Sequence, residues 1–241
     1  MSAVLRRGLA IALMACSTAA FTQTADLPSA ASPKNQAEIS FQFDHMGLQV
    51  PHFTLRVRED GSGRYVADQA EIAATANSMR GQAAQHVDRT VNLTSATVTK
   101  IFKAAKAANH FNIECESKAK NIADTGKKTL NYTGADGSGS CTYNYSENKT
   151  IDLLTNTFLA IAFTIDEGRR LEFLHRYDRL GLDAEMISFS QELEAGRALE
   201  LGTISPTLAA IADDTAVIQR VRLRAVKMLE QVTTESHETA H

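Results

Sequence analysis

Residues 115–141 read CESKAKNIADTGKKTLNYTGADGSGSC, and this stretch decides how the chain is expected to fold. It is bounded by two cysteines and contains a short alternating run, followed by an Asp-Gly-Ser-Gly turn at 136–139. Alternation places successive side chains on opposite faces of a strand, and Asp-Gly favours the tight turn of a β-hairpin. We therefore expect a hairpin here, with Cys141, Tyr143 and Tyr145 on one face of its second strand.

The two cysteines that bound this stretch are expected to form a disulfide. The third cysteine, Cys16, lies in a predicted export segment, so Cys115 and Cys141 remain as an even pair. Such a pair in an exported chain is typically bridged, because the extracytoplasmic compartment is oxidising. A redox pair would usually be Cys-x-x-Cys, and a metal site would need further ligands at close spacing. Neither pattern is present, so the sequence predicts a structural disulfide.

Residues 1–20 have the features of a secretory signal peptide. Two arginines precede a short apolar run at 9–15, which is too short to span a bilayer. Small residues at 18–20 fit ordinary cleavage, which we favour. The run Leu-Met-Ala-Cys is similar to a lipobox, in which Cys16 would be lipidated instead. The expected location is periplasmic or secreted, with lipid anchoring in the bacterial envelope as the alternative.

After the signal peptide we expect three regions. Residues 21–37 are rich in Ala, Ser, Thr, Gln and Pro and predict a disordered tether. Residues 38–168 predict an α+β domain, in which a small antiparallel sheet of hairpins is covered by two helices. Residues 169–241 predict a C-terminal helical extension, with a polar tail that frays from Thr233 onward.

The first half of the α+β region carries the strand signals. Large apolar residues alternate with polar ones at 39–43 and again at 53–57. The Asp-Gly-Ser-Gly run at 60–63 predicts the turn of a hairpin, and the returning strand follows it. Residues 69–85 predict a loop or weak helix before a short extended piece at 87–93.

The two covering helices have clear periodic patterns. Thr94 is the expected N-cap of the first, whose apolar residues recur at i, i+3, i+4 and i+7. These residues are Val98, Ile101, Phe102 and Ala105. The second helix begins at Thr150 and has the broad apolar face of a helix buried against a sheet. Farther on, Ser205 is the expected N-cap of a helix that opens a HEAT-type helical hairpin at 206–229.

Asp124-Thr125-Gly126 is the one tripeptide that is similar to a catalytic signature. Asp-Thr-Gly is the active-site triplet of aspartic proteases, where two such loops bring two carboxylates together to share a proton. This chain has a single copy, and Lys127 and Lys128 follow it directly. We therefore interpret the triplet as a polar turn that leads into the strand at Thr129.

The histidines and serines give no second catalytic candidate. No two of the seven histidines have helical i, i+4 spacing on an expected helix, and His45 with His52 is the pair to test for metal binding. Ser62, Ser138 and Ser140 are expected in hairpin turns and lack a Gly-x-Ser-x-Gly elbow. No phosphate-binding or dinucleotide-binding glycine motif is present, so we expect no cofactor.

Two basic clusters lie on the expected helices of the extension. Arginines 169, 170, 176 and 179 form the first, and residues 220–227 contain the second. Either could meet anionic lipid headgroups or a partner. We interpret both as solvated faces paired with acids such as Glu167, Glu172 and Asp178.

The composition excludes some functions. The 241 residues carry a net charge of −3, so the chain lacks the basic field of a nucleic-acid-binding protein. Tryptophan is absent and aromatic residues make up 6% of the chain, which argues against stacking platforms for carbohydrate.

The hairpin at 51–65, the Thr94-capped helix and the run Ala-Asp-Thr-Gly-Lys-Lys-Thr at 123–129 resemble exported bacterial proteins of unknown function, over residues 38–168. That resemblance implies no catalytic residues. We expect an exported non-enzymatic envelope protein that binds a protein or cell-wall partner, with membrane contact only through a lipid anchor at Cys16. The alternative is an extracytoplasmic enzyme whose site is assembled from residues distant in sequence. A deep pocket with convergent ionisable groups would favour that alternative.

Overall fold

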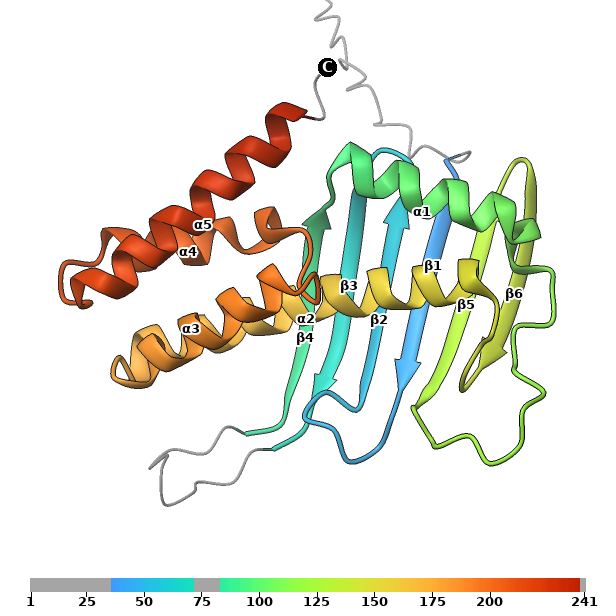
Figure 1. Ribbon diagram of the computed structural model, residues 1–241, viewed down its shortest axis with the longest axis horizontal. Coiled ribbons are helices and arrows are strands. Elements are labelled where there is room, and N and C mark those ends of the chain that lie inside the picture. The colour runs from blue at the N-terminus through green and yellow to red at the C-terminus, as the bar shows by residue number, and fades with distance from the viewer. Residues whose placement is uncertain (1–35, 72–82, 239–241) are drawn as a thin grey trace, which may run out of the picture. The chain divides into compact units, whose positions relative to one another are not determined.

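The computed structural model describes residues 36–71 and 83–238, and it confirms an α+β fold. Six antiparallel strands form one sheet in the spatial order β4-β3-β2-β1-β5-β6 (Figure 1). The strands are β1 (Glu38–Asp44), β2 (His52–Arg58), β3 (Ser62–Gln69), β4 (Gln85–Asn92), β5 (Lys127–Gly134) and β6 (Gly137–Tyr143). Both predicted hairpins are present, as β2–β3 and β5–β6.

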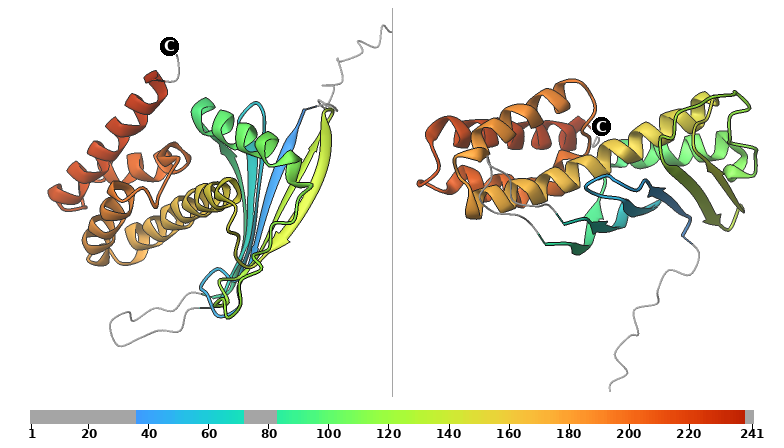
Figure 2. Two further views of the ribbon diagram at one scale, coloured as in Figure 1. Left: turned by 45° about the vertical axis from the view of Figure 1, so that its right-hand side comes forward. Right: turned by 90° about the horizontal axis from the view of Figure 1, so that it is seen from below.

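Alternation in the sequence decides which face of the sheet is covered. One row of directly opposed residues crosses five strands, and all of its side chains are buried. The row is Tyr65, Leu55, Phe41, Leu130 and Cys141. Two helices, α1 (Ser95–Ala107) and α2 (Lys149–Tyr177), lie on this face, and no helix of residues 36–71 or 83–238 lies on the opposite face (Figure 2). Phe158 of α2 stacks on Phe41 with ring centroids 5.2 Å apart.

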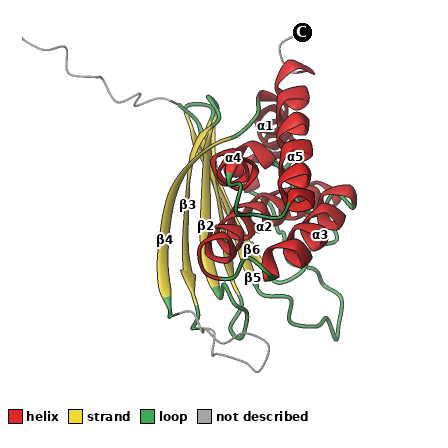
Figure 3. Cartoon of the chain, turned by 90° about the vertical axis from the view of Figure 1, so that its left-hand side faces the viewer, coloured by secondary structure: helices red, strands yellow, loops and turns green. Residues whose placement is uncertain are grey.

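Helix α2 is shared by two hydrophobic cores. Its first turns pack on the sheet as far as Ile165, and from Leu171 it packs on the C-terminal helices. These are α3 (Gly181–Glu194), the 3-10 helix η2 (Leu201–Ile204), α4 (Ser205–Asp213) and α5 (Gln219–Glu238) (Figure 3). The two cores therefore lie along one continuous helix.

Residues 200–204 fasten the C-terminal helices to the sheet layer. The carboxylate of Glu200 accepts hydrogen bonds from the backbone N and the Oγ1 of Thr94, at 2.8 and 2.7 Å. Thr94 is the predicted N-cap of α1 and also accepts from the backbone N of Thr97. Gly168 permits the close crossing of α2 and η2, since a Cβ there would lie 2.2 Å from Cγ2 of Ile204.

Several predicted details of the strands were wrong. Tyr145 lies beyond β6 and is 45% exposed, because the strand ends at Tyr143. The hairpin turns are shorter than the Asp-Gly-Ser-Gly runs, so Ser62, Ser138 and Ser140 lie in strands.

The helix boundaries also differ from the prediction. Ser205 is the first residue of α4 and makes no side-chain cap, because the preceding 3-10 helix runs directly into it. Helix α5 continues past Thr233 to Glu238. Ala37, assigned to the tether, is buried beside β1, and its carbonyl accepts from the backbone N of Glu59. The expected signal peptide, Cys16 and most of the loop at 69–85 lie outside the described residues.

Candidate functional site

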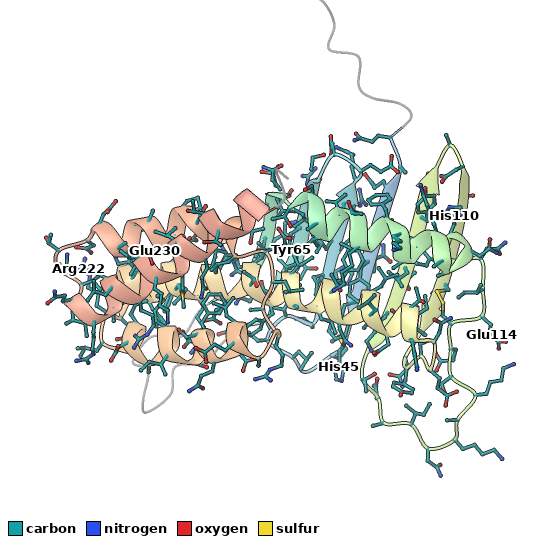
Figure 4. All side chains as sticks on the ribbon, turned by 45° about the horizontal axis from the view of Figure 1, so that its top comes forward. His45, Tyr65, His110, Glu114, Arg222 and Glu230 are labelled. Atoms are coloured by element: carbon teal, nitrogen blue, oxygen red, sulfur yellow. A yellow bond between two sulfur atoms is a disulfide. The ribbon has the colours of Figure 1, made fainter. Side chains whose placement is uncertain are left out.

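Cys115 and Cys141 lie at disulfide distance, with 2.01 Å between the sulfurs and 5.8 Å between the Cα atoms. The bond links the segment after α1 to the edge strand β6, and both residues are buried (Figure 4). In the two described segments, no helix has the length and apolar character needed to cross a membrane.

The Asp-Thr-Gly triplet forms a tight turn. Asp124 Oδ1 accepts the backbone N–H of Gly126 at 2.9 Å. Thr125 is fixed to the residue after β6, because its backbone N donates to Asn144 Oδ1 at 2.7 Å and its Oγ1 donates to Asn144 O at 2.8 Å. Gly126 has a φ of 88°, which favours glycine. This geometry fits the interpretation of the triplet as a polar turn.

The turn also encloses the ammonium group of Lys128. Its Nζ donates to the carbonyl oxygens of Thr125, Gly126 and Asn144, at 2.9, 2.9 and 2.8 Å. It also lies 2.9 Å from Thr125 Oγ1 and 5.6 Å from the ring centre of Phe43. Burial lowers the pKa of Lys128, and the charges of nearby carboxylates act against that shift. The lysine therefore holds the ends of β5 and β6 together.

The structure does not bring His45 and His52 together as metal ligands. His52 Nδ1 lies 2.5 Å from Asp44 Oδ1, whereas the His45 ring contacts Phe43 edge-on. His45 lies in the loop that follows β1 (Figure 4). Across the described residues, no group of three or more His, Cys, Asp or Glu side chains could hold a metal ion.

His110 belongs to a polar cluster at the other end of α1. Three consecutive residues, Asn109, His110 and Phe111, have positive φ values of 51°, 53° and 65°. Such a conformation costs roughly 1–2 kcal/mol per residue. The centre of the His110 ring lies 4.4 Å from that of the Tyr132 ring, tilted by 36°, and His110 Nε2 lies 3.4 Å from Asp136 Oδ2. This sharp turn brings the backbone of His110 against β6 and directs the chain toward the disulfide.

The strongest candidate site is a cavity of about 600 Å³ between the outer strands and the last turns of α2. We call it the arginine cavity. Its lining residues come from the end of β3, the start of β4 and one face of α2. They are Gln69, Ala83, Ala84, Gln85, Arg89, Arg169, Arg170, Glu172, Phe173, Arg176 and Tyr177.

Three of the four arginines are held by acidic side chains. Arg89 donates two hydrogen bonds to Glu172, at 3.0 and 2.6 Å. Arg170 Nε lies 2.6 Å from Glu185 of α3. Arg169, whose side chain is 10% exposed, pairs with Asp166 at 3.3 Å and also donates to Gln69 and Gln85. The guanidinium groups are therefore fixed before any ligand arrives.

Arg176 differs from the other three. Its guanidinium lies 5.2 Å from the ring centre of Tyr177, and no ion pair is found for it among the residues that the structure describes. The rings of Phe173 and Tyr177 are 5.1 Å apart. Arg176 therefore brings an uncompensated positive charge to an aromatic wall.

The acids around the cavity differ in their protonation. Burial acts to raise the pKa of Glu172, but hydrogen bonds from Arg89 and Thr207 outweigh it, and the net shift is downward. Burial raises the pKa of Asp166, which accepts a hydrogen bond from Tyr65 at 2.7 Å. Burial, with Glu185 alongside, raises the pKa of Glu167 to about 8. Glu172 is therefore ionised at neutral pH, whereas Glu167 retains its proton.

Sequence reasoning found the basic cluster but not the cavity. It named Glu167, Glu172 and Asp178 as partners, and of these only Glu172 binds an arginine of the cavity, which is Arg89 of β4. The second basic cluster pairs with Asp183 through its residues 220 and 224. One signal was available, because Arg169, Phe173 and Arg176 recur at i, i+4 and i+7 on one helix face.

Comparisons with known proteins leave the cavity without an assigned role. No protein-family model matches this chain, and no curated protein matches its sequence. The chemistry of the lining residues is therefore the basis for proposing a function.

Proposed function

We propose that this protein is an exported, non-enzymatic component of the bacterial envelope that binds a protein or cell-wall partner. We further propose that the arginine cavity holds the part of the partner that is recognised. One observation carries this proposal: the cavity is lined by fixed guanidinium groups and aromatic rings. Fixed cations beside apolar rings are typical of binding sites.

The enzyme alternative has one observation in its favour. The cavity gathers ionisable groups from β4 and α2, which are distant in sequence. However, guanidinium groups do not transfer protons at physiological pH, and Glu172, the one carboxylate among the described lining residues, is held by Arg89 and Thr207. Asp166 and Glu167, whose pKa values are raised, are not among the lining residues. Binding therefore fits the lining better than acid–base catalysis.

The bonded cysteines support export. A buried disulfide between Cys115 and Cys141 is typical of chains that fold in an oxidising compartment. The signal-peptide pattern at residues 1–20 and the alternative lipid anchor at Cys16 point to the same compartment.

Site-specific crosslinking in the source cells tests this proposal. The full chain would carry the photoreactive residue p-benzoylphenylalanine at position 173, in the cavity. A matched control would carry it at position 218, where Ile218 is exposed before α5. We expect an extracytoplasmic protein and a discrete adduct from position 173 only. Cytoplasmic, unprocessed protein would contradict export, and adducts at equal levels from both positions would contradict recognition at the cavity.

A further inference from the structure

We propose that the arginine cavity binds an oxyanion, a carboxylate or a phosphate, that is attached to a flat apolar group. In this arrangement Arg170 and Arg176 contact the oxyanion, and Phe173 with Tyr177 contacts the flat group. This inference rests on the proposed function, because it names the chemistry that the partner presents.

The negative charge of the proposed ligand follows from the charges in the lining. Among the described residues of the lining, four arginines face one glutamate, and Glu172 already accepts two hydrogen bonds from Arg89. Asp166 and Glu185 pair with Arg169 and Arg170, but no ion pair is found for Arg176 within the described ranges. Its positive charge is therefore unbalanced beside the other guanidinium groups, and like charges at this distance repel. An anionic group would relieve that repulsion.

The two contact residues follow from the hydrogen bonds already made. Arg169 and Arg89 donate through their terminal nitrogens to residues of the protein. Arg170 is held through Nε, and no hydrogen bond of its terminal nitrogens is found within the described ranges. Arg176 likewise has no acidic partner there. Paired guanidinium donors of this kind match the oxygens of carboxylate and phosphate groups.

The flat group follows from the aromatic wall. Phe173 lies one helical turn from both Arg170 and Tyr177, so the rings and the arginines share one face of α2. Rings at a cavity wall favour flat apolar groups, which contact them at low entropic cost. A cavity of about 600 Å³ has the size of an ordinary small-ligand site and accommodates a single ring with its charged substituent.

Titration of the purified mature protein tests this inference, with phenyl phosphate, benzoate, inorganic phosphate and phenol as probes in calorimetry. We expect phenyl phosphate or benzoate to bind, inorganic phosphate to bind about tenfold more weakly, and phenol not to bind. The first two probes distinguish a phosphate from a carboxylate as the preferred oxyanion. Added salt should weaken binding. Equal affinity for phenol and the anions, or binding of no probe, would overturn the inference.

Variants locate the binding within the molecule. Arg176→Gln should weaken the anionic probes by about tenfold or more, since it removes a charged donor. Arg179→Gln is the matched control, because Arg179 lies two residues after the end of α2, pairs with Asp214 and does not line the cavity. Phe173→Leu should weaken phenyl phosphate and leave inorganic phosphate unchanged. Equal losses in Arg176→Gln and Arg179→Gln would show a general charge effect and reject the site.

The two proposals can fail separately. If the anionic probes bind in solution but no specific adduct forms in cells, the anion site is supported and the proposed function is rejected. If the adduct forms from position 173 but no anionic probe binds, recognition of a partner at the cavity is supported and the oxyanion site is rejected.

Discussion

At the residue scale, Lys128 shows how one buried ammonium group can join the ends of two neighbouring strands. Its ammonium group donates to three backbone carbonyls at the ends of β5 and β6. Lys128→Met would keep the apolar stem but leave these carbonyls without a donor, which is expected to cost about 2–4 kcal/mol. Urea unfolding would measure this loss. Lys127→Met is the matched control, since that side chain is exposed, and an equal loss there would contradict the role of the cage.

Glu167 gives a pH dependence whose sign can be worked out. Burial, with Glu185 alongside, raises the pKa of Glu167 from 4.5 to about 8. Between these values the folded protein keeps a proton that the unfolded chain releases. The contribution of Glu167 to stability is therefore complete below about pH 4.5 and is lost as the pH rises toward about 8.

Glu167→Gln should remove this loss, because an amide does not ionise. We expect the free energy of unfolding of the variant, relative to the parent, to increase between pH 5 and pH 9 by at least about 1 kcal/mol. Urea unfolding at several pH values measures it. Glu194→Gln, on the exposed surface of α3, is the control and should show a constant difference. A constant difference for Glu167→Gln as well would contradict the raised pKa.

Some single residues were predictable from the sequence and others were not. The cysteine pair followed from counting, because only two cysteines remain after the predicted export segment. The roles of Lys128 and Glu200 did not follow, since each depends on backbone atoms that the fold brings near. Alternation places Lys128 on the same face as Leu130 and Tyr132, which is buried, but it does not reveal the carbonyls that hold the ammonium group.

At the scale of the elements, the start of α1 is stabilised by a residue from the C-terminal helices. Glu200 accepts from the backbone N and the Oγ1 of Thr94. Glu200→Ala removes this acceptor and is expected to cost about 1–2 kcal/mol. Urea unfolding would be measured for Glu200→Ala, for Thr94→Ala and for the double variant. The double variant should lose less free energy of unfolding than the sum of the two single losses. Additive losses would contradict a direct interaction between the two residues.

The disulfide is the second connection between elements. It ties the segment after α1 to β6 and closes the loop that contains the Asp-Thr-Gly turn. Replacing Cys115 and Cys141 together by Ser should cost roughly 3–4 kcal/mol, because the unfolded chain regains the freedom of that loop. Peptide mapping of exported protein without reductant should recover the two cysteines linked. Two alkylatable thiols in that material would contradict the bond.

Element types were easier to predict than element ends. In β1 the apolar residues Phe41 and Phe43 alternate with polar ones, so one face of the strand is buried, and this period of two predicted the strand correctly. The ends depend on neighbours instead. Helix α2 continues through Gly168 to Tyr177, because its last turns pack in the second core and Gly168 permits its close approach to Ile204. Sequence reasoning expected residues 169–241 to form an extension, which begins inside this helix.

At the scale of the whole molecule, the arginine cavity illustrates what a sequence does not reveal. Its lining combines residues of β4 and α2, and Glu185 of α3 holds Arg170. The basic residues could be read from the chain, but their convergence depends on how α2 crosses the outer strands. That crossing is decided by packing between the two cores.

Gly168 offers a test of how closely the two cores are joined. A Cβ at this position would lie 2.2 Å from Cγ2 and 2.9 Å from Cβ of Ile204, so Gly168→Ala forces α2 and η2 apart. We expect a loss of about 1–3 kcal/mol, as is usual for overpacking. The displacement of η2 has a second consequence. Because η2 directly follows Glu200, moving it strains the hydrogen bonds between Glu200 and Thr94. Both cores should therefore lose stability together, and urea unfolding followed by two probes should show one shifted transition.

Ile204→Ala provides the matched background for this test. It creates space beside α2 and is itself costly, because Ile204 is buried. In that background the contact of 2.2 Å with Cγ2 is removed and the contact of 2.9 Å with Cβ remains, so the cost of Gly168→Ala should fall below its cost in the parent. The double-mutant cycle measures the difference as a coupling energy. An unchanged cost would mean that helix strain elsewhere, and not the crossing of α2 with η2, requires glycine at this position.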